Sequence, residues 1–413
     1  MTTALRSFGR APWLIAAIAL SKAGTLAYTT VMLWAVNQYA GAGGVGLVNA
    51  LGGLTSVLAG ISATVWIDRF DRRMILLVLD GITAALTFLA VGVLVLTPWN
   101  NVTVIAATIA MVTAAAASLY SPASRSLVPA LVPQSSLEQY NSFYTSFTEL
   151  SRAIGPALGT ILLAVGGSDA FALSLLVNGL SFAFSFLFTM NLPRVEGHRV
   201  EDRRHDRAFS AYAYLAGQPH LLGDLAGAMG INFALSSLTY VLLGRLAETG
   251  SPASMFGLAH SIEAIGVVVS ALLAARLGDS LRLMRAPQLL VPVALSLLIG
   301  LLAGPWTVTA AITAAAILVT FFNIVLFSRL QREIPREIIG RVVAVVTTSS
   351  AALIPLGNLV FAFLASRVTS NTLILITCAG LVALRFIAAH LGRRTLKAGS
   401  PSLQNGSAGA STS

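Results

Sequence analysis

Residues 68–97 read DRFDRRMILLVLDGITAALTFLAVGVLVLT, and this stretch decides the fold class. It begins with a short loop of two aspartates and three arginines, and continues with 24 residues in which Asp80 is the only charge. An α-helix needs about 20 apolar residues to cross the hydrocarbon core of a bilayer. The apolar run is therefore predicted to span a membrane, with the basic loop in water at its end.

The rest of the chain has a similar composition. Of its 413 residues 56% are hydrophobic and 10% are charged, and the mean hydropathy is +0.82. Soluble domains average about 25% charged residues. The composition therefore excludes an ordinary soluble enzyme, and it excludes a disordered chain, which would be polar.

Apolar runs of this kind recur, and we expect each to form one transmembrane helix. The predicted spans are 12–37, 45–66, 74–97, 102–122, 139–166, 169–190, 220–245, 253–277, 287–304, 306–328, 339–366 and 371–391. The alternation typical of barrel strands is absent from the sequence. The first run continues past Lys22, so we expect an uncleaved span and not a signal peptide. The predicted fold is an all-α membrane protein with twelve transmembrane helices in two six-helix halves.

Lysine and arginine positions predict the orientation, because cytoplasmic loops carry an excess of both. With both termini inside, 21 of the 26 basic residues fall in cytoplasmic segments, and only Arg245 and Arg367 fall in outer loops. This asymmetry explains the net charge of +10 without nucleic acid as a partner. We expect a multi-pass protein of the bacterial cytoplasmic (inner) membrane that has both termini in the cytoplasm, contacts the lipid bilayer and functions as a monomer.

A polar segment in the middle of the chain divides it into two parts of similar length. The predicted boundaries are a cytoplasmic N-terminus at 1–11, an N-terminal half at 12–190, a cytoplasmic linker at 191–219, a C-terminal half at 220–391 and a disordered cytoplasmic tail at 392–413. A six-plus-six repeat with a site between its halves is typical of transporters.

Motifs for ATP-driven or enzymatic chemistry are absent from the sequence. Neither Lys22 nor Lys397 stands in a P-loop, and there is no His-Glu-x-x-His or Gly-x-Ser-x-Gly motif. The single cysteine, Cys378, allows no intramolecular disulfide, and the five histidines are scattered. We therefore expect no enzyme, no metal site and no cofactor, and a proton gradient as the energy source.

The loop Asp68-Arg69-Phe70-Asp71-Arg72-Arg73 resembles the signature of the major facilitator superfamily between spans 2 and 3, G-x-x-x-D-R-x-G-R-R. Thr64 and Asp71 stand where that signature has glycines. Residues 120–129 and 330–357 are similar to the branch that includes the enterobactin exporter and macrolide-efflux-type proteins. The resemblance covers 12–391 and implies a transporter that works by alternating access.

A second motif, Gly155-Pro156-x-x-Gly159, is similar to the span 5 signature of antiporters and implies export. We expect its proline to break a helix hydrogen bond and its glycines to allow close helix approach; the alternative is an inert kink. For the basic loop, the arginines are expected to cap helix ends and lock the two halves in one state; the alternative is a plain positive-inside anchor. The span 4 arginine of many drug/proton antiporters is missing, since 102–122 holds no charge.

Ionisable side chains near the centre of a span are costly and mark functional sites. Four are predicted there: Lys22, Glu149, Arg152 and Glu263. Arg152 shares a helix face with Glu149 and pairs either with it or, in one state only, with Glu263 across the halves. Glu263 or Glu149 is predicted to carry the coupling proton, with Glu263 favoured because Glu149 has a partner next to it. Lys22 contacts an anionic substrate group or a neighbouring glutamate, or forms a structural ion pair.

Other polar residues complete the predicted site. Tyr28, Asn232 and Asn323 are expected to face the cavity, and His260, one turn before Glu263, has either a packing role or a proton-relay role. Asp80 and Asp224 lie nearer the cytoplasmic ends of their spans, where we expect them to join polar networks.

These residues predict a secondary active transporter, a proton-coupled exporter of a small amphipathic organic compound such as a drug, an antibiotic, a siderophore or another secondary metabolite. An apolar cavity with few charges suits such a cargo better than it suits a sugar, which needs many hydrogen-bonding groups. The alternatives are a proton-coupled importer or uniporter of a small organic solute, and a non-transporting membrane receptor or assembly factor.

Overall fold

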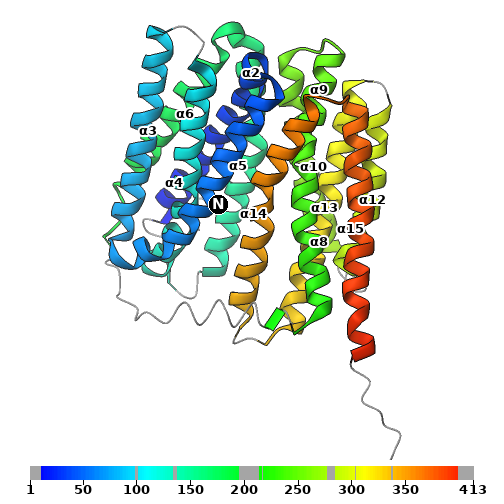
Figure 1. The fold of residues 1–413 in the computed structure, drawn as a ribbon. Coiled ribbons are helices and arrows are strands. Elements are labelled where there is room, and N and C mark those ends of the chain that lie inside the picture. The colour runs from blue at the N-terminus through cyan, green and yellow to red at the C-terminus, as the bar shows by residue number, and fades with distance from the viewer. Residues whose placement is uncertain are drawn as a thin grey trace, which may run out of the picture.

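The computed structural model describes most of the chain, and the described part is a bundle of helices without any strand (Figure 1). The described residues are 11–97, 101–133, 137–194, 214–215, 217–276, 284–302, 304–335 and 338–398. The predicted linker at 191–219 falls mostly outside them, as do 1–10 and 399–413.

Two groups of helices lie side by side, the N-bundle in blue to teal and the C-bundle in green to red (Figure 1). The N-bundle consists of α2 (Ala11–Arg69), α3 (Arg72–Leu96), α4 (Val102–Leu131), α5 (Leu137–Gly166), η3 (Gly167–Asp169) and α6 (Ala170–Thr189). The C-bundle consists of α8 (Pro219–Leu235), α9 (Ser237–Glu248), α10 (Ala253–Arg276), η4 (Ala286–Leu289), α12 (Leu290–Leu297), η5 (Leu298–Leu301), α13 (Pro305–Glu333), α14 (Ile339–Ala365) and α15 (Ser370–Ala398).

Nine segments of the described chain are long and apolar enough to cross a membrane. Two of them, Ala11–Ser62 and Phe143–Thr189, are long enough to cross twice, and Ala286–Leu301 is a shorter apolar segment. Counted in this way, the described chain makes twelve crossings. The predicted all-α membrane fold of twelve helices in two halves is thereby confirmed.

Three details differ from the sequence prediction. The first two spans are joined by a kink at Gly41 (φ 61°, ψ −168°), where the backbone leaves the helical region in a conformation that favours glycine. The seventh span is broken between α8 and α9 at Ser236, which has helical dihedral angles and so gives no Gly or Pro signal. The last helix continues to Ala398, so the predicted disordered tail at 392–413 begins too early.

The two bundles meet through α2 against α14 and α5 against α10. A methyl group added to Gly53 in α2 would lie 2.5 Å from Pro355 Cγ in α14. One added to Gly257 in α10 would lie 2.4 Å from Thr160 Oγ1 in α5. Small residues let helix backbones approach closely within a membrane. These contacts lie towards the end of the molecule that holds Gly41, which we call the closed end; the opposite end, with the loop at 70–71, is the open end.

Candidate functional site

A cavity of about 1340 Å³ lies between α5, α9, α10 and α13. Along α5 it runs from Ala153 back to Thr145, and along α10 from His260 on to Leu272. Both directions lead away from the Thr160–Gly257 contact, so the cavity extends from that contact towards the open end. Its polar lining is Thr145, Ser146, Glu149, Arg152, Thr239, His260, Glu263, Thr320 and Asn323. The other lining residues are apolar, including Leu150, Ile265 and Leu272, whose side chains are exposed.

A second cavity, of about 230 Å³, lies on the α2 side of the first. It is lined by Leu26, Thr29, Thr30 and Leu33 of α2, by Pro156 and Ala264, and by five residues that also line the larger cavity. The shared residues are Glu149, Arg152, His260, Glu263 and Val267. The ionisable groups therefore stand where the two cavities meet.

The two charges of α5 form a loose pair. Arg152 Nε lies 3.8 Å from Glu149 Oε2, and the side chains are 54% and 39% exposed. Residues three apart share one face of a helix. A pair at this distance and exposure contributes little to stability. About half of the side chain of Arg152 thus remains exposed where it lines the two cavities.

The acid of α10 has a closer partner. His260 Nδ1 lies 3.0 Å from Glu263 Oε2, and both side chains are partly buried. The ring of His260 stands edge-on to Phe256 at 4.7 Å between centroids, which fixes its orientation. In the described part of the chain no ion pair joins Arg152 to Glu263, so in this conformation each glutamate is paired within its own helix.

Lys22 of α2 is half-buried and lies within electrostatic range of both Glu149 and Arg152. It is not among the residues that line either cavity. Lys22 therefore adds a positive charge close to Glu149 and Arg152, but its side chain does not line the larger cavity.

Of the three predicted uncharged cavity residues, the structure places only Asn323 in the lining. Tyr28 is 1% exposed and packs its ring against Phe171 of α6, at 6.1 Å between centroids, so it belongs to the core of the N-bundle. Asn232 donates its side-chain N–H to the backbone oxygen of Ala228, one turn before the break at Ser236. Neither Tyr28 nor Asn232 lines either of the two cavities described above.

The basic loop has a structural role at the open end. Asp71 caps α3 by accepting the backbone N–H of Met74 at 2.9 Å. Arg73 donates to the last carbonyls of α6, to Thr189 at 3.3 Å and to Met190 at 2.6 Å. A cation is favourable at a helix C-terminus, because the unpaired carbonyls there carry partial negative charge. Arg72 opens α3; the side chains of Asp68 and Arg69 lie outside the described residues.

The antiporter-like motif packs α5 onto the first crossing of α2. A methyl group added to Gly155 would lie 2.5 Å from Leu26 Cβ, and one added to Gly159 would lie 2.8 Å from Thr30 Cβ. Pro156 lies inside α5, and its ring faces the smaller cavity. The motif therefore brings α5 close enough to α2 to place Glu149 and Arg152 within range of Lys22.

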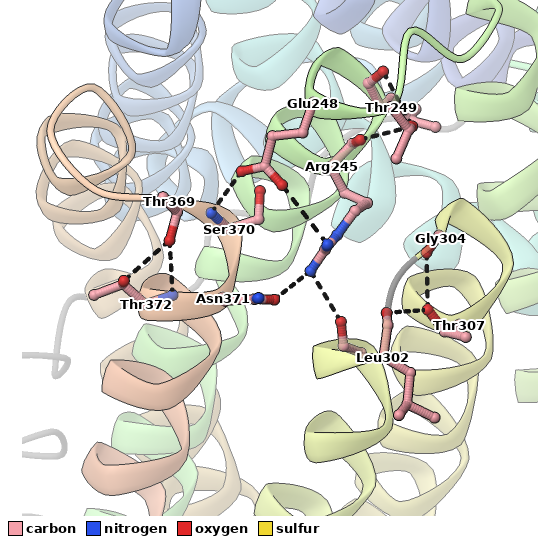
Figure 2. A network of polar contacts seen from close by, with 12 residues as sticks. Arg245, Glu248, Thr249, Leu302, Gly304, Thr307, Thr369, Ser370, Asn371 and Thr372 are labelled. Carbon is pink, nitrogen blue, oxygen red and sulfur yellow. Dashed lines mark hydrogen bonds and ion pairs between the residues drawn. The ribbon is translucent and has the colours of Figure 1, made fainter.

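A second charged cluster lies at the closed end of the C-bundle (Figure 2). Arg245 donates to the carbonyl oxygen of Gly300 at 3.1 Å and to the side-chain oxygen of Asn371, and pairs with Glu248 at 3.7 Å. Glu248 in turn accepts the backbone N–H of Ser370 at 2.9 Å. The sequence placed Arg245 in an outer loop; the structure buries it in α9, where it links α9, η5 and the start of α15.

Sequence reasoning did not find the hydroxyls Thr145, Ser146, Thr239 and Thr320 that line the cavity. No sequence signal separates them from the many serines and threonines that bond to their own helix one turn back, as Thr320 does to Ala316 at 2.9 Å. The charged residues stood out because charges are rare within spans.

A family model described as Major Facilitator Superfamily matches residues 13–358 of the chain. No curated protein matches the sequence closely enough to count as a relative. Solved structures of the same architecture match over almost the whole chain. The nucleoside transporter NupG matches with a TM-score of 0.70 at 14% identity, over 93% of this chain and 99% of its own. A D-xylose-proton symporter matches with a TM-score of 0.71 at 12% identity, over 91% of this chain and 96% of its own.

A bacterial homologue of the iron transporter ferroportin matches in two conformations. Its inward-facing state gives a TM-score of 0.68 at 16% identity, over 93% of this chain and 98% of its own. Its outward-facing state gives a TM-score of 0.59 at 16% identity, over 93% of this chain and 100% of its own. At these identities the likeness concerns the fold alone.

Proposed function

The chain belongs to the Major Facilitator Superfamily and is a membrane transporter of that type, and we propose that it exports a small amphipathic organic compound in exchange for protons. The observation that carries this proposal is the meeting of two glutamates, an arginine and a histidine in a cavity whose other walls are largely apolar. Such a cavity offers apolar contact area and a few charged groups that fix orientation.

Glu263 is the proposed carrier of the coupling proton. A carboxylate inside a membrane protein that faces an aqueous cavity can exchange a proton with it, and such residues mark proton paths. His260 holds one carboxylate oxygen of Glu263 and so positions the group. Glu149, paired with Arg152, is proposed to keep the guanidinium aligned.

Arg152 is the proposed contact for an anionic or strongly polar group of the cargo. More than half of its side chain is exposed to the cavity. The apolar wall formed by Leu150, Ile265 and Leu272 suits the remainder of an amphipathic molecule. Lys22 adds positive charge behind this contact.

The conformation supports a transport cycle by alternating access. We assign the open end to the cytoplasm, because the arginines at 69–73 stand there and cytoplasmic loops are enriched in arginine. On this assignment the protein, placed in a bacterial cytoplasmic membrane, faces inward. Export then requires the contacts of Gly53 and Gly257 to separate while the open end closes.

The test uses purified protein in proteoliposomes with a pH-sensitive dye inside and an imposed pH gradient. Macrolides, cationic dyes and siderophores are added singly, and collapse of the gradient is followed. We expect at least one compound to collapse it with wild-type protein and with Glu149→Gln, and none to do so with Glu263→Gln. Asp169→Asn, which removes an exposed acid far from the cavity, is the matched control and should behave as wild type.

Two results would count against the proposal. If Glu263→Gln retains full coupling, another group carries the proton. If no compound moves protons while a labelled compound still equilibrates across the membrane, the protein is a uniporter and the cavity acids serve binding alone.

A further inference from the structure

A third acid lies inside the N-bundle, away from both cavities. Asp80 of α3 is 0% exposed and faces α6 and α4. It lines neither cavity, so the proposed transport cycle makes no use of it. A completely buried carboxyl group needs a physical explanation, because an isolated charge inside a protein is very costly.

The partners of Asp80 are hydroxyl groups. Its Oδ2 accepts from Ser185 Oγ at 2.8 Å and from Thr189 Oγ1 at 3.4 Å, both on α6. The hydroxyl of Tyr120 in α4 lies 3.5 Å from Ser185 Oγ and interacts with the same carboxyl group. Its other oxygen, Oδ1, is buried and has no hydrogen-bond partner in the described part of the chain.

No cation among the described residues balances Asp80. On its own helix, Arg73 donates to the carbonyls of Thr189 and Met190. On α4, Arg125 is exposed, and α6 contains no basic residue. The titratable group that faces Asp80 from α4 is Tyr120, whose hydroxyl is buried beside it.

Asp224 is a second buried acid in the same fold, and it has a charged partner. It is also buried, at 2% exposure, in α8 near the open end of the C-bundle. Its Oδ2 lies 2.7 Å from Nη1 of Arg329, which also bonds Glu333 through Nε at 2.7 Å. Asp224 has a charge partner with good geometry, and Asp80 has none, so the two buried acids differ in the charge they can hold.

We propose that Asp80 is a proton-binding site, separate from the transport cavity, that carries its proton in this conformation. The proton resides on Oδ1, and Oδ2 acts as the carbonyl oxygen that accepts from Ser185 and Thr189. Loss of the proton places an uncompensated negative charge between α3 and α6. That charge is stabilised only if water or a cation reaches it, which requires α3 and α6 to move apart near the open end.

The position of the site gives the proton a structural consequence. Thr189 is the last residue of α6, and its carbonyl is held by Arg73 while its hydroxyl is held by Asp80. Two contacts from α3 therefore fix the end of the helix that leads into the segment between the bundles. Protonation of Asp80 sets how firmly α3 holds this helix end, whichever cavity acid carries the coupling proton.

The test is infrared difference spectroscopy of the full-length protein in lipid, in H₂O and D₂O, across a pH titration. We expect the C=O stretching band of a protonated carboxylic acid, shifted in D₂O, in wild type, in Glu263→Gln and in Asp224→Asn. The band that these three proteins share should be absent in Asp80→Asn. Ser185→Ala, which keeps the acid but removes its closest hydrogen bond, should keep the band and shift its frequency.

This measurement needs no substrate, so its outcome is independent of the transport assay. Asp80→Asn has nearly the shape of a protonated aspartate and should match wild type in thermal unfolding midpoint, which checks that the variant is folded. A band that persists unchanged in Asp80→Asn, or that is missing from wild type, would overturn the proposal. Disappearance of the wild-type band when Na⁺ replaces choline at constant pH would assign the site to a metal cation and overturn it equally.

Discussion

Two clusters of charged side chains within the membrane-crossing helices differ in their burial and in the number of their partners. Arg245, at the closed end, has a side chain that is 7% exposed, and it bonds or pairs with groups on three elements (Figure 2). Arg152, in the cavity, is 54% exposed and has one long contact with Glu149 in its own helix. A buried charge whose partners surround it holds elements together, whereas an exposed charge with one loose partner is available to a ligand.

The difference shows that a charge within a span has no single meaning. Both arginines carry an acid three residues away on the same helix. Only the tertiary surroundings distinguish them: Arg245 meets the carbonyl of Gly300 and the amide of Asn371, and Arg152 meets a cavity. The predictions below test this distinction through stability, from the largest expected change to the smallest.

Arg245→Ala is expected to have the largest effect. Removal of one partner from a buried ionic network costs about 3–5 kcal/mol when another partner is left buried. Here the loss leaves the buried carbonyl of Gly300 without its partner and also removes the contacts with Asn371 and Glu248, which are exposed. The measurement is the denaturant midpoint of the protein in mild detergent micelles, followed by intrinsic tryptophan fluorescence.

Two variants serve as controls for Arg245. Arg245→Lys keeps the charge but loses the planar fork that reaches two acceptors at once, so we expect only partial recovery. Arg367→Ala removes the other basic residue of the closed-end turns, which lies exposed over the ring of Phe363 at 3.6 Å. A cation–π contact at an exposed site is worth about 0.5–1 kcal/mol. Equal destabilisation by Arg245→Ala and Arg367→Ala would refute the distinction.

Gly257→Leu is expected to have an intermediate effect. Its side chain would meet Thr160, where even a methyl group would lie 2.4 Å from Oγ1 and 2.9 Å from the backbone Cα. Overpacking a close contact costs about 1–3 kcal/mol. Because this contact joins α5 to α10, we expect the closed end to be forced apart as well.

Accessibility at the closed end can be followed with a cysteine placed at Trp34, after the single native Cys378 has been replaced by serine. Trp34 packs against Phe256 at this contact, with 6.1 Å between ring centroids. Faster labelling by a membrane-impermeant thiol reagent is expected with Gly257→Leu. Gly92→Leu, at a glycine with open space around it, should leave both stability and labelling unchanged. Unchanged labelling in Gly257→Leu would show that this contact does not keep the end closed.

The fold was largely predictable because it follows from one-dimensional patterns. Twenty-residue apolar runs, a polar middle segment and a biased distribution of arginine are visible without any tertiary information. The missed features are local. The break in the seventh span falls at Ser236, which has helical dihedral angles and is neither glycine nor proline. Arg245 was assigned to an outer loop, but it lies within α9, three residues before the end of that helix.

The residues that line the cavity could be picked out from the sequence only in part. Glu149, Arg152 and Glu263 line it, and so does Asn323, whereas Lys22 does not; the charged residues are conspicuous in the sequence because charges are rare within spans. Tyr28 and Asn232 do not line it either, since aromatic and amide side chains also serve as core and as interhelical contacts. The contrast between Asp80 and Asp224 could not be predicted at all, because it depends on whether an arginine from another helix reaches the acid.

Arg152→Gln is expected to have the smallest effect on stability and a large effect on transport. The pair with Glu149 is exposed and 3.8 Å long, so its loss should change the unfolding free energy by less than about 1 kcal/mol. Glutamine is shorter than arginine, but its amide nitrogen reaches about the position of Arg152 Nε, the atom nearest Glu149, so it can still donate to Glu149. It carries no charge and cannot attract an anionic group of the cargo. We therefore expect Arg152→Gln to have a lower initial transport rate than wild type and the same denaturant midpoint. If Arg152→Gln instead lowers the midpoint as far as Arg245→Ala does, the cavity pair is a structural network like that at the closed end, and the proposed contact with cargo must be sought at Asn323 or Lys22.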